Sequence, residues 1–440
     1  MSSLNGPGKS VPGEQTPYHH GSHRDLLWAP VDCLPARQGV DAVIVPTARG
    51  PAYLTEAAEL ARSLGCTLVT LHSGKWTTAA KALQRFPAGV DLIAIDVPGP
   101  ERLRLPDWQT SRLLAGTVFA RRTDLSLKRN LALLLSHLLG WSHILFLDDD
   151  ITGLNPDDVR MASGLLATHN AVGLQIGGFP DHSVVCHAYR QAGGKQQSFI
   201  GGGALAVAVN RCRSFFPDIY NDDWFFLLDG DKGLQSTAVT GQVDQHPYDP
   251  FRNPERARAE ELGDVLAEGI YWLLDQDRSI VDADQGHWAR FLGKRAQFIQ
   301  DVLEMVRTDT LEPAEKARRI AALKGSLGRL ALITPDLCQS YLRAWAADRQ
   351  RWQRHLKRLP TGQQIPQALG ELSGRGCPPL TWRLGGQVSQ TGQISQTGQI
   401  GPISQIGRSA GGAGVPASQL LVPRSQALAG RLAVPAGHLL

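Results

Sequence analysis

Between residues 41 and 250, short apolar runs alternate with amphipathic stretches. The run at 42–45 predicts a buried strand, and the spacing of apolar residues from Tyr53 to Leu64 predicts a helix that ends at Gly65. Further strand patterns lie at 66–71, 90–96, 143–147, 171–176 and 204–209. Strands that alternate with helices in this way predict an α/β fold with a mostly parallel sheet and helices on both faces.

The strand patterns stop at about Pro254, and four long helical patterns follow at 255–274, 287–306, 313–330 and 336–359. We expect them to form a helical region packed on the α/β domain. From about Pro360 the chain is rich in Gly, Gln, Ser and Pro, with tandem hexapeptides at 387–392 and 393–398. Such composition favours disorder. The expected organisation is a loose arm (1–37), an α/β domain (38–254), a helical region (255–359) and a mostly disordered tail (360–440).

Composition limits the possible functions. The chain has 440 residues, 42% of them hydrophobic and 20% charged, as in soluble globular proteins. A net charge of +4 is too small for this length to indicate a nucleic-acid partner. No apolar run reaches the roughly 18 residues of a membrane helix, and the polar N-terminus lacks the apolar core of a signal peptide. The six cysteines form no CxxC pair. We therefore expect a cytoplasmic protein without integral membrane association.

The strand at 143–147 runs directly into three carboxylates, Asp148, Asp149 and Asp150. Crowded carboxylates repel one another unless a cation lies among them, and ligands of open α/β sheets bind at the carboxyl ends of the strands. The run therefore predicts Mn²⁺ or Mg²⁺ holding a phosphorylated ligand. Strand alternation would place Asp148 and Asp150 on one side as metal ligands, with Asp149 facing a sugar hydroxyl. The alternative is a solvated acidic turn before the helix near Asn155.

A cationic pair, Lys128 and Arg129, begins the helix that precedes the acidic strand. Ser126 is a candidate N-cap, and cations beside a helix N-terminus favour an anion such as a diphosphate. The alternative is that both are ordinary surface cations.

Five motifs in order carry a family resemblance: 44–47 (IVPT), 128–130 (KRN), 147–150 (LDDD), 201–204 (GGGA) and 221–224 (NDDW). Together they resemble the nucleotide-sugar-dependent glycosyltransferases of the GT-A fold, over about residues 38–250. The resemblance implies a GT-A-like Rossmann-type sheet and an Asp-x-Asp motif that binds metal and the donor diphosphate. It also implies an acidic motif, Asp222 and Asp223, whose last carboxylate deprotonates the acceptor hydroxyl in inverting members.

The resemblance assigns further roles. His246 becomes a third metal ligand beside Asp148 and Asp150, since some relatives supply a histidine just after the catalytic core; the alternative is a solvated loop histidine. The alternative for Asp222 and Asp223 is a helix N-cap. The residues expected to bind the nucleotide sugar are Pro46, Thr47, Lys128, Arg129, Asp148, Asp149, Gly202 and Gly203. The expected function is metal-dependent transfer of a sugar from a nucleoside-diphosphate sugar to a hydroxyl acceptor, with inversion.

Residues 146–152 also resemble the first motif of haloacid-dehalogenase-type phosphatases. There Asp148 would be the nucleophile, Asp150 the acid/base, Lys195 a phosphate partner, and Asp222 and Asp223 magnesium ligands. That motif usually lies on the first strand of its domain, whereas two strand–helix units precede it here. A nucleotidyltransferase would need a glycine-rich, lysine-containing loop after Val45, which is not evident. A non-catalytic GT-A-like scaffold remains, although a scaffold has no need for clustered carboxylates.

Overall fold

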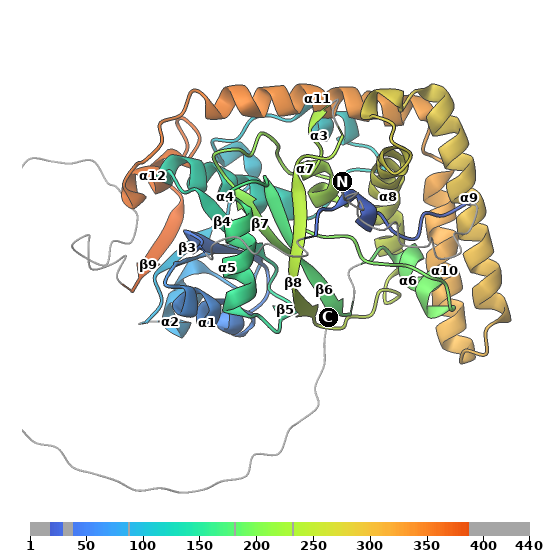
Figure 1. Cartoon of the computed structure of the whole chain (residues 1–440), viewed down its shortest axis with the longest axis horizontal. Coiled ribbons are helices and arrows are strands. Elements are labelled where there is room, and N and C mark those ends of the chain that lie inside the picture. Colours follow the sequence, from blue (N-terminus) through green and yellow to red (C-terminus); the bar gives the residue numbers. More distant parts are fainter. Residues whose placement is uncertain (1–17, 30–37, 87–88, 180–181, 231–232, 387–440) are drawn as a thin grey trace, which may run out of the picture. The chain divides into compact units, whose positions relative to one another are not determined.

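The computed structural model describes residues 18–29, 38–86, 89–179, 182–230 and 233–386. Its core is a nine-stranded sheet in the order β5-β8-β6-β7-β4-β1-β2-β3-β9 (Figure 1). The strands are β1 (Ala42–Thr47), β2 (Thr67–His72), β3 (Leu92–Asp96), β4 (His143–Leu147), β5 (Ile151–Thr152), β6 (Ala171–Gly178), β7 (Ala204–Ala208), β8 (Thr237–Gln245) and β9 (Thr381–Gly385).

Six strands run in one direction, so the sheet is mixed but mostly parallel. β1 pairs in parallel with both β2 and β4, β2 with β3, and β6 with β8. β7 lies antiparallel between β4 and β6, while β5 and β9 are antiparallel to β8 and β3. Strands buried on both faces read as apolar runs, which is why the sequence predicted the central ones. The expected α/β class with helices on both faces is confirmed.

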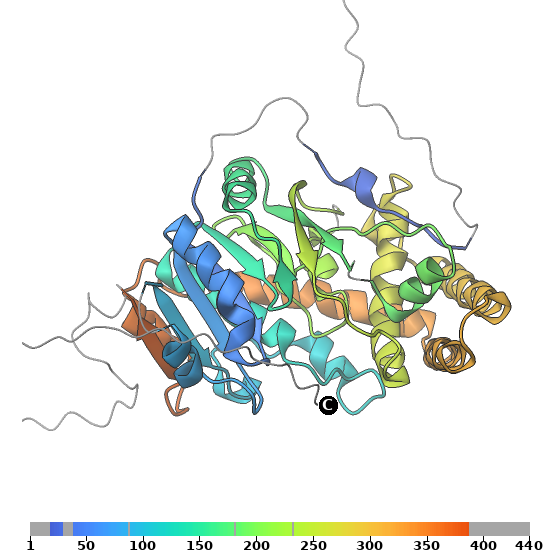
Figure 2. The same ribbon diagram turned by 90° about the horizontal axis from the view of Figure 1, so that it is seen from below.

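Helices lie on both faces of the sheet (Figures 1 and 2). An apolar cluster packs against each face. One face packs against α1 (Thr55–Leu64), α2 (Ala79–Arg85) and α5 (Pro156–Leu165). The other packs against α4 (Leu125–Leu139), whose Leu131, Leu134 and Leu138 are fully buried. Shorter helices are α3 (Gln109–Leu114), α6 (Val184–Gln191) and α7 (Asp222–Phe226).

The C-terminal helices pack into the same apolar cluster as α4, on that face of the sheet. They are α8 (Pro254–Leu274), α9 (Gln285–Thr308), α10 (Pro313–Leu330) and α11 (Pro335–Leu356), so each expected helix is present. Trp288, Trp345 and Trp352 are buried in that cluster and are among the largest fully buried side chains of the described residues. All described elements belong to one compact unit, so the helical region is packed on the α/β part. Among the described residues, no helix has the length and apolar character needed to cross a membrane.

The expected tail begins too early. Within it, α12 (Ile365–Glu371) buries Ala368 and Leu369, and β9 adds a strand to the sheet beside β3. Trp382 on β9 is 8% exposed, so burial of an aromatic side chain outweighs the polar composition around it. The hexapeptides and the rest of the tail lie outside the described residues.

The expected loose arm is also corrected for residues 18–29. His19 and His23 are buried, and Trp28 forms an isolated bridge to Ala238 on β8. A short 3₁₀ turn, Arg24–Leu26, lies between them. The rest of the arm lies outside the described residues. Strand β8 itself was missed, since its polar residues and Gly241 hide the strand pattern.

Candidate active site

The three aspartates leave β4 in a turn at the carboxyl end of the strand. The last antiparallel contact is the Asp148 N–H, which donates to Gly203 O at 2.9 Å. Residues 149 and 150 lie in a turn and not on the strand, so strand alternation does not orient them, and binding of a metal by Asp148 and Asp150 stays a prediction. Asp149 and Asp150 share one cation: Arg49 Nη1 lies 2.7 Å from Asp149, and Nη2 lies 3.1 Å from Asp150.

Arg129 is the buried centre of the site. Its side chain is 3% exposed and pairs with Asp148 at 3.1 Å and Asp222 at 2.9 Å. The guanidinium also lies over the Phe216 ring, 5.4 Å from the centroid. Burial alone would lower the pKa of Arg129, but Asp222 and Asp148 together raise it above its ordinary value. One permanently charged group thus holds together two acidic motifs that lie far apart in the sequence.

Lys128 is committed to the end of β1. Its Nζ donates to Thr47 O at 3.0 Å and to Ser73 Oγ at 2.6 Å, and it pairs with Asp124 at 3.0 Å. The side chain is 3% exposed, and burial lowers its pKa. Both cations of the motif are therefore buried, and the surface-cation alternative is wrong.

The start of α4 differs from the expectation in one detail. The N-cap position is Asp124, without a side-chain capping bond, and Ser126 lies inside the first turn. Ser126 Oγ donates to Asp222 Oδ2 at 2.7 Å instead. Ser126 therefore orients an acidic side chain of the site.

The glycine loop, residues 201–203, lies against the same charges. A Cβ built on Gly202 would lie 2.6 Å from the Arg129 guanidinium, and one on Gly203 would lie 3.3 Å from Asp148 Oδ2. A Cβ on Gly201 would lie 3.2 Å from Asp223 Oδ2. Because these glycines have no side chain, the charged groups of Arg129, Asp148 and Asp223 can lie directly against the backbone of the loop.

Asp223 lies at the wall of a small cavity of about 50 Å³ and is partly exposed. Its Oδ2 accepts from the Gly202 N–H at 2.6 Å, and its Oδ1 accepts from the Trp224 N–H at 2.9 Å. Burial first and then the charge of Asp222 raise its pKa above the ordinary value. A raised pKa makes this carboxylate a better proton acceptor than a solvated aspartate.

The N-cap alternative for the acidic motif does not account for Asp222. The N-cap of α7 is Asn221, in the left-handed region at φ 61° and without a side-chain capping bond. Asp222 is 4% exposed and bonds to Ser126 and Arg129, which lie on α4.

Thr47, Pro46, His246 and Lys195 are the remaining residues that the sequence placed at the site. Thr47 Oγ1 donates to Asp149 Oδ2 at 2.6 Å, so the end of β1 contacts the acidic turn, whereas Pro46 is buried within β1. The His246 side chain is exposed; only its backbone N–H approaches, donating to Asp150 O at 2.9 Å. Lys195 is exposed and, within the described ranges, forms no ion pair with an aspartate.

No three-ligand cluster forms among the three aspartates and His246 in the part of the chain that the structure describes. The donor set nevertheless consists of hard carboxylate oxygens at one turn, which suits Mg²⁺ or Mn²⁺. Arg49, which the sequence reasoning missed, pairs with Asp149 and Asp150, and its side chain is 43% exposed. Only its closeness to Thr47 in the first-strand motif hinted at a role.

The comparisons with known proteins give distant likenesses. No family model matches the chain, and no curated protein matches its sequence. A mannosyltransferase from Pyrobaculum calidifontis, solved with GDP-Man and Mn²⁺, is similar in structure at 15% identity and a TM-score of 0.33, over 74% of this chain and 90% of that one. A protein proposed to be a nucleotide-diphospho-sugar transferase, from Desulfovibrio desulfuricans, matches at 8% identity and a TM-score of 0.28, over 60% and 98%. At these identities and TM-scores neither likeness carries a functional argument, so the function is argued from the site itself.

Proposed function

We propose that the chain transfers a sugar from a nucleoside-diphosphate sugar to a hydroxyl acceptor. One observation carries the proposal: Arg129 joins Asp148 to Asp222, while the glycine loop holds the neighbouring Asp223. Motifs at 128–130, 148–150, 201–203 and 221–224 therefore meet at the carboxyl end of β4. Ligands of α/β sheets bind at that edge.

The donor diphosphate would bind between the end of β1 and the acidic turn. Lys128 and Arg49 are the cations there, and Lys128 is already fixed by Thr47 O and Ser73. Arg49 would exchange its carboxylate partners for phosphate oxygens, which a guanidinium binds in two-pronged fashion. Fixed cations stabilise the charge that develops on a departing diphosphate.

A divalent cation fits the same turn. Asp148 and Asp150 would hold it through carboxylate oxygens, with His246 as a further candidate ligand because its backbone already contacts Asp150. Bound there, Mn²⁺ or Mg²⁺ would supply Lewis-acid stabilisation of the leaving diphosphate.

Asp223 would accept the proton of the acceptor hydroxyl, in an inverting transfer. Its two hydrogen bonds from backbone N–H groups fix its orientation at the cavity wall, and its raised pKa suits a general base. Asp222 would act through position and charge, since it is bonded to Ser126 and Arg129 and is 4% exposed.

The test is a screen of nucleoside-diphosphate sugars with Mn²⁺, followed by thermal unfolding and by release of the nucleoside diphosphate. A nucleotide at 100 times its Kd adds about 2.7 kcal/mol to the free energy of unfolding. Asp150→Ala should abolish the metal-dependent part of that stabilisation. Asp223→Asn should keep donor binding and lower turnover by roughly 10²–10⁴-fold.

Asp249→Asn is the matched control, since Asp249 is an exposed carboxylate paired with Arg318, and it should behave as wild type. Full turnover by Asp223→Asn would refute the base assignment. Absence of any nucleotide-dependent shift, together with phosphatase turnover, would replace the proposal by the phosphatase alternative. A stable partner complex with no nucleotide affinity would favour the scaffold.

A further inference from the structure

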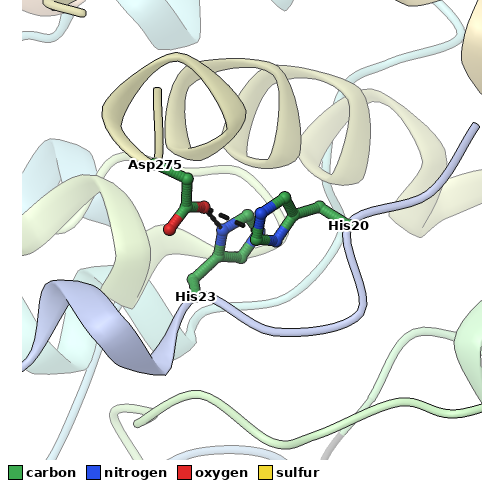
Figure 3. Close-up of side chains that lie close together, drawn as sticks. All are labelled: His20, His23 and Asp275. Carbon is green, nitrogen blue, oxygen red and sulfur yellow. Dashed lines mark hydrogen bonds and ion pairs between the residues drawn. The ribbon is translucent and has the colours of Figure 1, made fainter. Parts of the chain in front are cut away.

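A second cluster of metal-ligating side chains lies apart from the acidic turn (Figure 3). It joins His20 and His23, from the described part of the N-terminal arm, to Asp275 at the C-cap of α8. One donor atom from each residue lies within 4.8 Å of the other two. In the described part of the chain, no other group of three such residues converges in this way.

The geometry places three donor atoms around a common point. His20 Nδ1 lies 3.6 Å from Asp275 Oδ2, and His23 Nδ1 contacts the same oxygen. The two imidazole rings are nearly parallel, at an interplanar angle of 6° with centroids 4.7 Å apart. In Figure 3 both rings lie side by side and face the carboxylate.

His20 leaves one donor atom unused. Its Nδ1 is buried and has no hydrogen-bond partner. Most buried polar atoms in folded proteins have a partner, so a ring nitrogen without one, beside a carboxylate and a second imidazole, is a candidate ligand atom.

Glu268 contacts the second ring nitrogen of His23. His23 Nε2 lies 2.9 Å from Glu268 Oε2, and the His23 side chain is 3% exposed. A histidine that ligates a metal characteristically donates its other ring N–H to a carboxylate, which fixes the tautomer and the direction of the ligating nitrogen. Glu268 stands in that relation to the Nδ1 atom of His23.

We infer that His20, His23 and Asp275 bind one divalent transition-metal ion of the Zn²⁺ class. Two imidazole nitrogens and one carboxylate oxygen favour such an ion over Mg²⁺ or Ca²⁺, which prefer oxygen ligands. The charge of Glu268 and Asp275 together balances a divalent cation. The competing arrangement is metal-free, with His23 protonated between its two carboxylates.

The ion would fasten the arm to α8 beside the cavity at Asp223. His23 packs edge-on against Trp224, with ring centroids 5.4 Å apart, and Trp224 and Glu268 both line that cavity. The proposed site at His20, His23 and Asp275 is therefore separate from the carboxylate oxygens of Asp148 and Asp150.

The test uses the full chain, stripped with a chelator and titrated with Zn²⁺ alone by calorimetry. Wild type should show one more tight site than His20→Ala, or an affinity at least tenfold higher, and Zn²⁺ should raise its melting temperature more. Asp275→Asn should lose the site as well. Asp277→Asn is the matched control, because Asp277 is exposed two residues away and its φ of 56° suits asparagine.

Asp150→Ala should retain the Zn²⁺ site, which separates it from the acidic turn. If Asp275→Asn fails to fold, His20→Ala decides, with Co²⁺ absorption in the visible range as a second readout of nitrogen ligation. Equal stoichiometry and affinity in wild type and His20→Ala would overturn the inference and leave the metal-free ion pair.

Discussion

Replacing Arg129 by methionine tests whether one buried cation holds the site together. The substitution keeps a long apolar stem but removes the only charge that pairs with both Asp148 and Asp222, at 3.1 and 2.9 Å, among the described residues. Asp222 is 4% exposed, so water cannot replace the lost partner without rearrangement. Breaking a buried pair in this way costs about 3–5 kcal/mol of unfolding free energy.

The loss of unfolding free energy in Arg129→Met should also depend on pH, because the carboxyl groups near Arg129 lose their cation. Burial already raises the pKa of Asp148 and Asp223 in the wild type, and removal of Arg129 raises them further. A carboxyl whose folded pKa exceeds its unfolded value binds more protons when folded, so stability falls as pH rises above the unfolded pKa of about 3.9. The deficit of Arg129→Met should therefore shrink as pH is lowered from 7 toward 5, by up to about 1.4 kcal/mol per unit of pKa shift.

The assay is equilibrium denaturation in urea at several pH values, with the slope m compared to confirm a common unfolded state. Arg49→Met is the control, because Arg49 contacts the same acidic turn but is 43% exposed; it should cost only ~0–1 kcal/mol. An Arg129→Met protein within about 1 kcal/mol of wild type, or equal to Arg49→Met, would refute the reasoning.

Two further predictions concern packing and titration. Gly202→Ala would place a Cβ 2.6 Å from the Arg129 guanidinium and should lower the unfolding free energy by about 1–3 kcal/mol in thermal or urea unfolding. Gly293→Ala, where a Cβ meets nothing within 4 Å on α9, should be neutral or stabilising; equal effects would contradict the steric argument. Burial raises the pKa of Glu261 from 4.5 to about 7 despite its pairing with Arg295, so this group's contribution to stability falls as pH rises between those values. Glu261→Gln should flatten that part of the pH–stability curve, and an unchanged slope would exclude Glu261 as its source.

The parts of the fold that the sequence predicted are those with a local pattern. Strands β1 and β4 are apolar runs buried on both faces, and α10 carries a helical period over its whole length, Pro313–Leu330. Strand β9 is only five residues long, and its place in the sheet comes from pairing with β3, more than 280 residues earlier in the chain. No local pattern encodes a partner at that distance.

The candidate active site also has parts that the sequence predicted and parts that it did not. The acidic turn and the Lys128–Arg129 pair were visible because each is a run of neighbouring charges. The partners were not: Ser126 bonds to Asp222, and Arg49 bonds to Asp149, only because the fold brings separate turns together. For His246 the structure shows an exposed side chain and a backbone contact to Asp150, so its role as a metal ligand stays a prediction.

Strand β9 affects whether copies of this chain can associate through the edge of the sheet. Without β9, strand β3 would offer a row of unpaired N–H and C=O groups, which is a template for strand exchange and aggregation. The segment Thr381–Gly385 covers that edge along all five residues of β3 and becomes the edge strand itself; it is short and carries the charged Arg383, two features that disfavour further pairing. A fragment that stops at the end of the helices would keep every residue of the candidate active site and yet expose an adhesive edge. Protection against self-association is thus encoded far from the chemistry, in the last strand that the structure describes.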